Sequence, residues 1–147
     1  MKISIKLILY SFLLLATTGA QAQEETFTPP FDFPITFSGN FGEIRSNHFH
    51  GGLDFKTGGV IGKPVHALAD GHISRIRVTH GSGYVLDVDY DNGYSTINRH
   101  LSAFTGDVAR RVKELQYEKE SWEVEVVPEP GEYPVKAGQV IARSGNT

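Results

Sequence analysis

Short β-type runs separated by glycine-containing turns constrain the fold of this chain more than any other feature. Within one of these runs, at 84–90, apolar and acidic side chains alternate, so that Leu86 and Val88 share one face. A hairpin-type turn signal at Asp70-Gly71 follows the first run, and turn signals at 81–83 (GSG) and 91–93 (DNG) separate later runs. The runs are 65–68, 73–78, 84–90, 94–101, 122–127 and one that begins near 140. Regular spacing of this kind is typical of antiparallel β domains, and we predict a small, mainly β domain with an antiparallel sheet.

Residues 107–120 break the β pattern. Val108, Val112 and Leu115 recur at helical spacing, and Asp107 is a suitable N-cap. We expect a helical insert at about 105–120 that packs its apolar stripe on the sheet. A helix that binds a partner or a membrane surface is the alternative, but three apolar side chains make only a narrow stripe.

The first 22 residues have the features of a secretory signal peptide. Lys2 and Lys6 precede an apolar run at 7–16, and Ala20-Gln21-Ala22 is a small-x-small cleavage pattern. The run is shorter than the ~20 apolar residues that a membrane-spanning helix needs. We therefore expect residues 1–22 to be removed, no transmembrane span in the mature chain, and a secreted or periplasmic location in the cell envelope.

The remaining chain has the length of one domain. Residues 23–40 form a proline-bearing lead-in segment, in which we expect neither a regular helix nor a central strand, and residues 41–147 form the domain itself. The absence of cysteine excludes a disulfide scaffold, a thiol nucleophile and a cysteine-ligated zinc site. A formal net charge of -3 gives no basic surface for nucleic acid.

The segment 47–55 (NHFHGGLDF) carries the densest group of chemically reactive side chains. His50 and Asp54 flank two glycines, which can let the backbone turn so that the imidazole and the carboxylate converge. A histidine nitrogen and an aspartate oxygen are normal zinc ligands. His48 competes for the histidine role, because residues two apart on a strand share a face. The alternative is a turn in which Asp54 caps backbone N–H groups while a histidine packs nearby.

The other histidines have no ligand-like neighbours in the sequence. His100 lies near the end of the 94–101 run, where a lone histidine is commonly half-buried and bonded to a backbone carbonyl. We interpret His66, His72 and His80 as surface or packing residues.

Four segments, in the same order, resemble the M23 (lysostaphin/LytM-type) zinc metallopeptidases. They are HGGLDF, GKPVHALADGHI, DNGYSTINRHL and PVKAGQVIARSGNT, and they span residues 41–147 apart from an insert at 104–133. The resemblance implies that His50 and Asp54 bind Zn²⁺ and that His100 lies at the catalytic centre, in a groove on the sheet. It also implies an extracytoplasmic endopeptidase that cleaves the peptide cross-links of peptidoglycan.

The chain departs from the pattern of this family at three places. Asn98 stands where the family has a tyrosine, the insert is long, and the sequence ends at Thr147, before the family's His-x-His motif with its third zinc ligand. A catalytic zinc ion normally has three protein ligands. From the sequence we therefore expect an incomplete piece of a peptidase that is inactive alone.

Two other functions compete with this one. A non-catalytic relative that binds the wall or regulates another hydrolase would not need His50, Asp54 and His100. A biotinyl or lipoyl carrier needs a lysine at a hairpin tip, and the tips at 81–83 and 91–93 contain none.

Overall fold

The computed structural model describes residues 26–146, so the predicted signal peptide lies outside the described residues. A seven-stranded antiparallel sheet has the order β3-β9-β6-β5-β4-β7, with β8 paired to β4, and β1 and β2 form a separate pair. This confirms the predicted mainly β, antiparallel fold. The elements are β1 (Phe37–Gly39), β2 (Asp54–Phe55), β3 (Pro64–His66), β4 (Gly71–Thr79), β5 (Gly83–Tyr90), β6 (Ser95–Phe104), α2 (Gly106–Glu118), β7 (Val124–Val126), β8 (Pro134–Val135) and β9 (Val140–Ser144).

The centre of the sheet is the meander β4-β5-β6, joined by the two predicted turns. Gly83 and Gly93 adopt positive φ angles of 65° and 86°, which L-residues with a side chain rarely use. The hairpin that the sequence suggested at Asp70-Gly71 is wrong, because β3 pairs with β9 instead of β4. Asp70 instead accepts a hydrogen bond from the backbone N–H of Ala137 and pairs with Lys136.

A β-bulge in β4 sets which side chains enter the core. The register shifts between Ile73 and Arg75, so the strand changes phase there. Ile73 is buried before the bulge, and Ile76 and Val78 are buried after it. Side chains alternate strictly in a regular strand, so without the bulge Ile73 and Ile76 would face opposite sides.

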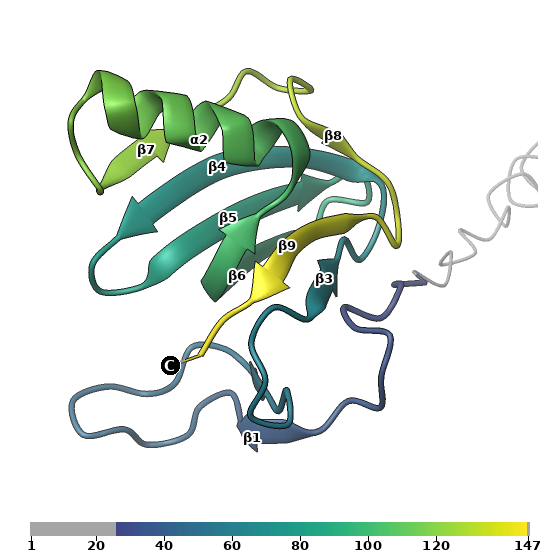
Figure 1. Cartoon of the computed structure of the whole chain (residues 1–147). Helices are drawn as coiled ribbons and strands as arrows, with labels where there is room; N and C mark the ends of the chain where they lie inside the picture. The colour runs from purple at the N-terminus through teal and green to yellow at the C-terminus, as the bar shows by residue number, and fades with distance from the viewer. Residues whose placement is uncertain (1–25, 147) are drawn as a thin grey trace, which may run out of the picture.

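Helix α2 packs on one side of the large sheet (Figure 1). Val108, Val112 and Leu115 are its buried residues, as the helical spacing predicted. The predicted N-cap is wrong: Thr105 occupies that position in extended conformation, and Asp107 lies in the first turn. The Thr105 hydroxyl donates to the carbonyl oxygen of Val140, so it ties the helix start to β9 and does not cap the helix.

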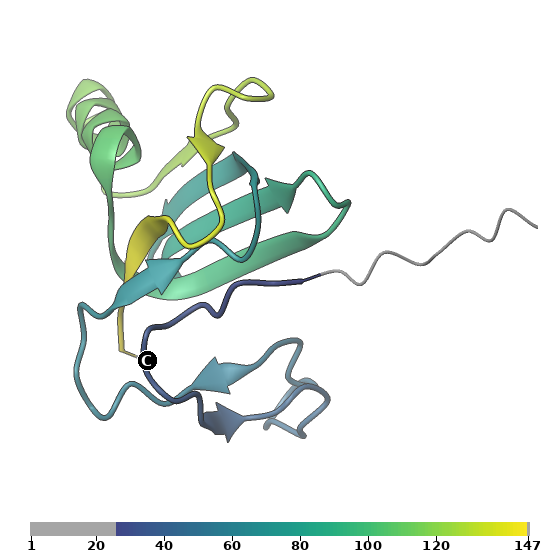
Figure 2. The same ribbon diagram turned by 90° about the vertical axis from the view of Figure 1, so that its right-hand side faces the viewer.

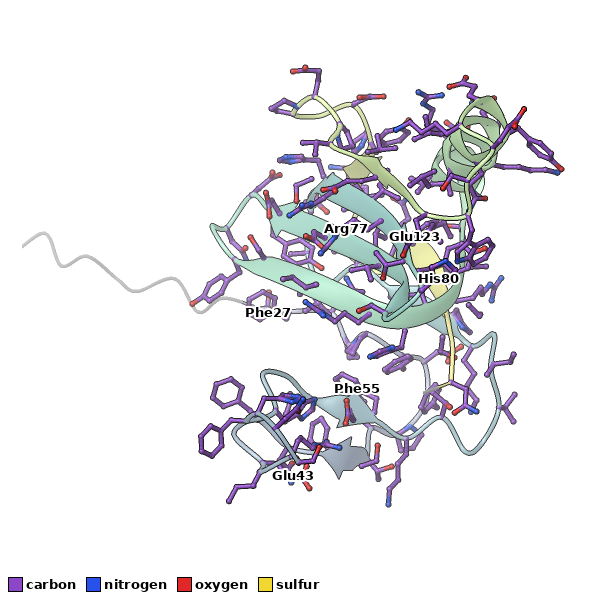
Figure 3. The ribbon with its side chains drawn as sticks, turned by 90° about the vertical axis from the view of Figure 1, so that its left-hand side faces the viewer. Phe27, Glu43, Phe55, Arg77, His80 and Glu123 are labelled. Atoms are coloured by element: carbon purple, nitrogen blue, oxygen red, sulfur yellow. The ribbon has the colours of Figure 1, made fainter. Side chains whose placement is uncertain are left out.

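The two-stranded sheet lies on the opposite side of the large sheet from α2 (Figure 2). Phe55 of β2 packs against Phe37 of β1 in a tilted arrangement and against Phe31 edge-on, with ring centroids 5.3 and 5.2 Å apart. Phe31 belongs to the buried core of the domain, so this aromatic cluster attaches β1 and β2 to the rest of the fold. Figure 3 shows Phe55 between the two sheets.

Residues 26–34 run as irregular backbone beneath the large sheet, as the sequence predicted. The carbonyl of Pro30 accepts a hydrogen bond from the N–H of His66, and the N–H of Thr28 donates to the carbonyl of Leu68. These bonds fix the segment beside β3. Among residues 26–146, no helix is long and apolar enough to cross a membrane.

Candidate metal and catalytic site

His50 and Asp54 lie next to each other beside the two-stranded sheet. Asp54 begins β2, opposite Gly39 of β1, and the loop between the two strands carries His50 back to it. Nε2 of His50 is 3.2 Å from Oδ1 of Asp54. The loop is closed by paired backbone hydrogen bonds between Glu43 and His50, and between Gly42 and His50. The structure therefore brings together the two predicted metal ligands.

A hydrogen bond of His50 to the backbone determines which of its ring nitrogens is left to face Asp54. Nδ1 lies 3.0 Å from the carbonyl oxygen of Asn40, which can only accept a hydrogen bond. Nδ1 must therefore carry the hydrogen, so the neutral ring offers the lone pair of Nε2 to an ion, whereas a second hydrogen on Nε2 would donate to the carboxylate of Asp54. Metal-bound histidines are held in this way, with one nitrogen donating to a carbonyl and the other free for the ion.

The spacing of these two acceptors fits a shared cation. Two donor atoms that each lie about 2.0–2.1 Å from one tetrahedral zinc ion are about 3.3 Å apart. The observed 3.2 Å between Nε2 of His50 and Oδ1 of Asp54 agrees with that separation. The pair thus fits two zinc ligands in donor type and in distance.

The glycines between the two ligands do not have the role that the sequence suggested. Gly51 and Gly52 are not among the residues with positive φ, and a Cβ atom at Gly51 would meet nothing within 4 Å. The convergence of His50 and Asp54 instead follows from the pairing of β1 with β2.

The remaining histidines lie outside this pair. His48 is exposed, and its Nδ1 contacts the side-chain oxygen of its neighbour Asn47 at 2.5 Å, so the structure selects His50 and not His48 as the partner of Asp54. His66, His72 and His80 are half-buried or exposed. Within residues 26–146, no group of three or more His, Cys, Asp or Glu side chains surrounds a point where a metal ion could sit.

Arg45 holds the second oxygen of Asp54. Its Nη2 is 2.9 Å from Oδ2 of Asp54 and 3.2 Å from Oε2 of Glu43. Arg45 was not predicted from the sequence, because nothing local in the sequence connects it to a carboxylate nine residues away. Only the pairing of β1 with β2 brings the two side chains together.

His100 sits at a β-bulge in β6. Leu86 of β5 is opposite Asn98 and Tyr84 is opposite Leu101, so Arg99 and His100 together face a single residue of β5. His100 has a φ of 56°, in the left-handed region that residues other than glycine rarely adopt. Bulges beside active sites redirect a side chain, and strained backbone of this kind gathers at functional positions. The sequence predicted that the strand ends close to His100. In the structure the strand continues to Phe104.

Asp54 and His100 line the same cavity, which has a volume of about 240 Å³. Asn98 and Gly145 contribute to its wall. Burial in this wall and the positive charge of Arg99 lower the pKa of His100, whereas the negative charge of Asp54 partly opposes them. The cavity thus favours the neutral imidazole, the form that can accept a proton.

Gly145 lies against the backbone of His100 and was also missed from the sequence. A Cβ atom at Gly145 would collide with the carbonyl oxygen of His100. A larger cavity, about 540 Å³ between α2, Tyr84 and Trp122, is lined by none of the candidate site residues.

One comparison with known proteins found a match. The family model described as Peptidase family M23 matches residues 48–117, a range that contains His50, Asp54 and His100. No curated protein and no solved structure matched the chain.

Proposed function

Since this chain belongs to peptidase family M23, we propose that it is a zinc metalloendopeptidase that cleaves the peptide cross-links of peptidoglycan outside the cytoplasm. The observation that carries the proposal is the 3.2 Å approach of Nε2 of His50 to Oδ1 of Asp54, next to a cavity that Asp54 shares with His100. A metal-dependent hydrolytic site needs a group that holds a cation and a group that moves a proton, and these three residues offer both.

His50 and Asp54 would hold the zinc ion through Nε2 and Oδ1. When bound, zinc acts as a Lewis acid that polarises the scissile carbonyl group and activates water. The hydrogen bond from Nδ1 of His50 to the carbonyl of Asn40 fixes the ring orientation before the ion arrives.

His100 would take a proton from the attacking water and return one to the leaving amine. Its lowered pKa keeps the ring neutral, as a general base requires near neutral pH. The bulge holds the ring in the cavity wall, so little reorganisation is needed at the moment of reaction.

The proposed location rests on the sequence of the first 22 residues. The positive start, the apolar run and the Ala20-Gln21-Ala22 pattern favour export and cleavage near Ala22. Peptidoglycan peptides are found in that compartment, which makes them the substrate class we propose.

The second candidate function is a non-catalytic module that binds the wall or regulates a hydrolase. Residues 26–146 offer a pair of metal ligands and no larger cluster, and this is the observation that favours it. A catalytic zinc ion normally has three protein ligands and one open position.

An assay with isolated peptidoglycan separates the two candidates. The purified chain is incubated with peptidoglycan and zinc, with and without free imidazole, and released peptides are identified by mass spectrometry. Because the described residues supply two donors, we expect cleavage when imidazole fills a further coordination position and little cleavage without it.

The matched variants are His100→Ala, His50→Ala and His48→Ala. We expect the first two to abolish peptide release and the third to leave it unchanged. Retention of the chain on peptidoglycan with no released peptides under either condition would contradict the peptidase proposal and support the binding module.

A further inference from the structure

The side chain of Arg45 connects the candidate metal pair to the loop that follows β1. Its Nη2 contacts Oδ2 of Asp54 at 2.9 Å, while Oδ1 of the same carboxylate faces His50. The two oxygens of Asp54 therefore have different partners. A carboxylate that accepts a hydrogen bond at one oxygen cannot rotate freely, so Arg45 determines the direction in which Oδ1 points.

The backbone of β1 leaves space for this contact. Gly39 is opposite Asp54 in the register of β1 and β2. A Cβ atom at Gly39 would collide with Nη2 of Arg45 and with the carboxylate of Asp54. Gly39 has no positive φ, so the reason for a glycine here is the space that the ion pair occupies and not the backbone conformation.

Glu43 balances the charge of the guanidinium group. Its Oε2 lies 3.2 Å from Nη2 of Arg45 and also accepts a hydrogen bond from the N–H of Asn40 at 3.2 Å. A lone cation beside a metal ligand would repel a divalent ion. With Glu43 on its other side, Arg45 can hold Asp54 while the group of three side chains keeps one net negative charge. Figure 3 labels Glu43 beside the two-stranded sheet.

We infer that Arg45 is a positioning residue that, with Glu43 and the space at Gly39, orients Asp54 for metal binding; this inference rests on the proposed function of the His50–Asp54 pair. Residues that hydrogen-bond to metal ligands usually contribute 10–100-fold in metal affinity (an order-of-magnitude range). An arginine offers a planar donor group that fixes a carboxylate, whereas a lysine offers a point charge on a flexible stem.

The opposite possibility is that Arg45 competes with the metal for Asp54. In that case, removal of the guanidinium group would free the carboxylate and strengthen metal binding. The observed geometry favours positioning, because Arg45 contacts Oδ2 and leaves Oδ1 directed at Nε2 of His50.

Zinc titration of the purified chain and its variants distinguishes these possibilities. We expect Arg45→Gln to weaken zinc binding about 10-fold or more, and Arg45→Lys to recover part of the loss. Gly39→Ala should weaken binding although Arg45 is still present, and Glu43→Gln should weaken it by exposing the metal to an unbalanced positive charge. Cobalt(II) in place of zinc adds an absorption spectrum that reports on the ligand geometry and that a general loss of stability would not shift.

Two control variants make the same kinds of substitution at positions away from the candidate metal pair. Arg75→Gln removes an exposed arginine that pairs with Glu125 of β7, and Gly81→Ala adds a Cβ atom where nothing lies within 4 Å. Both should bind zinc like the unchanged chain. Urea unfolding of every variant separates a loss of fold from a loss of metal affinity.

Crystal structures of the metal-free chain and of Arg45→Gln provide a readout that does not depend on zinc. We expect the Asp54 carboxylate to turn away from His50 in the variant. If the unchanged chain binds no zinc, the proposed function fails, and these two structures still decide the inference. Unchanged or tighter zinc binding by Arg45→Gln, or an Asp54 carboxylate that keeps its orientation in the variant, would overturn the positioning role.

Discussion

His100 has a backbone conformation that costs energy for every residue except glycine. Its φ of 56° lies in the left-handed region, where a Cβ atom costs roughly 1–2 kcal/mol. The N–H of His100 donates to the carbonyl of Ser82, and the carbonyl of His100 lies against Gly145, so neighbouring backbone holds the residue in place. The fold tolerates this cost at the residue to which we assign proton transfer.

Replacing the side chain of His100 with a hydrogen atom (glycine) or with a methyl group (alanine) measures the backbone strain. We predict that His100→Gly is more stable than His100→Ala by about 1 kcal/mol in urea unfolding, because glycine adopts positive φ without cost. In a regular strand we expect the opposite order of stability, with the alanine variant more stable than the glycine variant. His72→Gly and His72→Ala in β4 are suitable controls. Equal stability of the two His100 variants would show that the left-handed backbone carries no strain.

The pKa of His100 gives a second prediction at the scale of one residue. Burial in the cavity wall and the charge of Arg99 lower the pKa of His100 from its ordinary value of 6.5. The folded state thus favours the neutral ring, and the unfolded chain binds the proton at higher pH. The contribution of the neutral His100 ring to the free energy of unfolding is complete above pH 6.5. It is lost as the pH falls through the lower pKa that His100 has in the folded state.

Two measurements check the direction of the His100 pKa shift and of the pH dependence of unfolding that follows from it. A proton NMR titration should give His100 a lower pKa than an ordinary exposed histidine, and His100→Gln should remove this part of the pH dependence of unfolding. A His100 pKa at or above 6.5 would contradict the described environment of the ring.

Some of the site was predictable from the sequence because it is local. His50 and Asp54 are four residues apart in one short motif, so the sequence identifies them as a pair, although their convergence follows from the pairing of β1 with β2. Arg45, Gly39 and Gly145 were not predictable, since their contacts with Asp54 and His100 depend on strand pairing and on a bulge that no local pattern encodes.

At the scale of elements, α2 stabilises the sheet from the side opposite the candidate site. Leu115 is 7% exposed and faces the sheet, whereas Lys113 is exposed. We predict that Leu115→Ala lowers the free energy of unfolding by about 2–5 kcal/mol, since it removes a buried side chain and leaves a cavity.

Lys113→Ala is the matched surface change on the same helix, and we expect a change within about 0.5 kcal/mol. Both variants should keep the zinc affinity of the unchanged chain wherever the fold is retained. An equal loss of stability in the two variants would mean that α2 does not pack on the sheet through Leu115.

The elements themselves were largely predictable, but their exact pairing was not. Alternation and turn signals identified β4, β5, β6 and α2 near their observed limits. β1 was not predicted, because its three residues carry no alternation and are recognisable only through their pairing with β2. The supposed hairpin at Asp70 failed since β3 pairs instead with β9, which lies far away in the sequence.

At the scale of the whole molecule, the candidate site lies where the two sheets meet. The aromatic cluster of Phe31, Phe37 and Phe55 fixes the small sheet to the core, and this places Asp54 in a cavity with His100 of the large sheet. Figures 1 and 2 show that α2 lies on the other side. Asp54 of the candidate metal pair and His100, the proposed proton-transfer group, therefore belong to different sheets, and their relative position depends on packing between the sheets.

The most direct test is an equilibrium zinc titration of the unchanged chain beside His50→Ala, Asp54→Ala and His48→Ala. The account predicts one zinc ion per unchanged chain, loss of binding in the first two variants, and unchanged binding in His48→Ala, whose imidazole lies two residues away and outside the pair. Zinc binding that survives both His50→Ala and Asp54→Ala would contradict the assignment of this site.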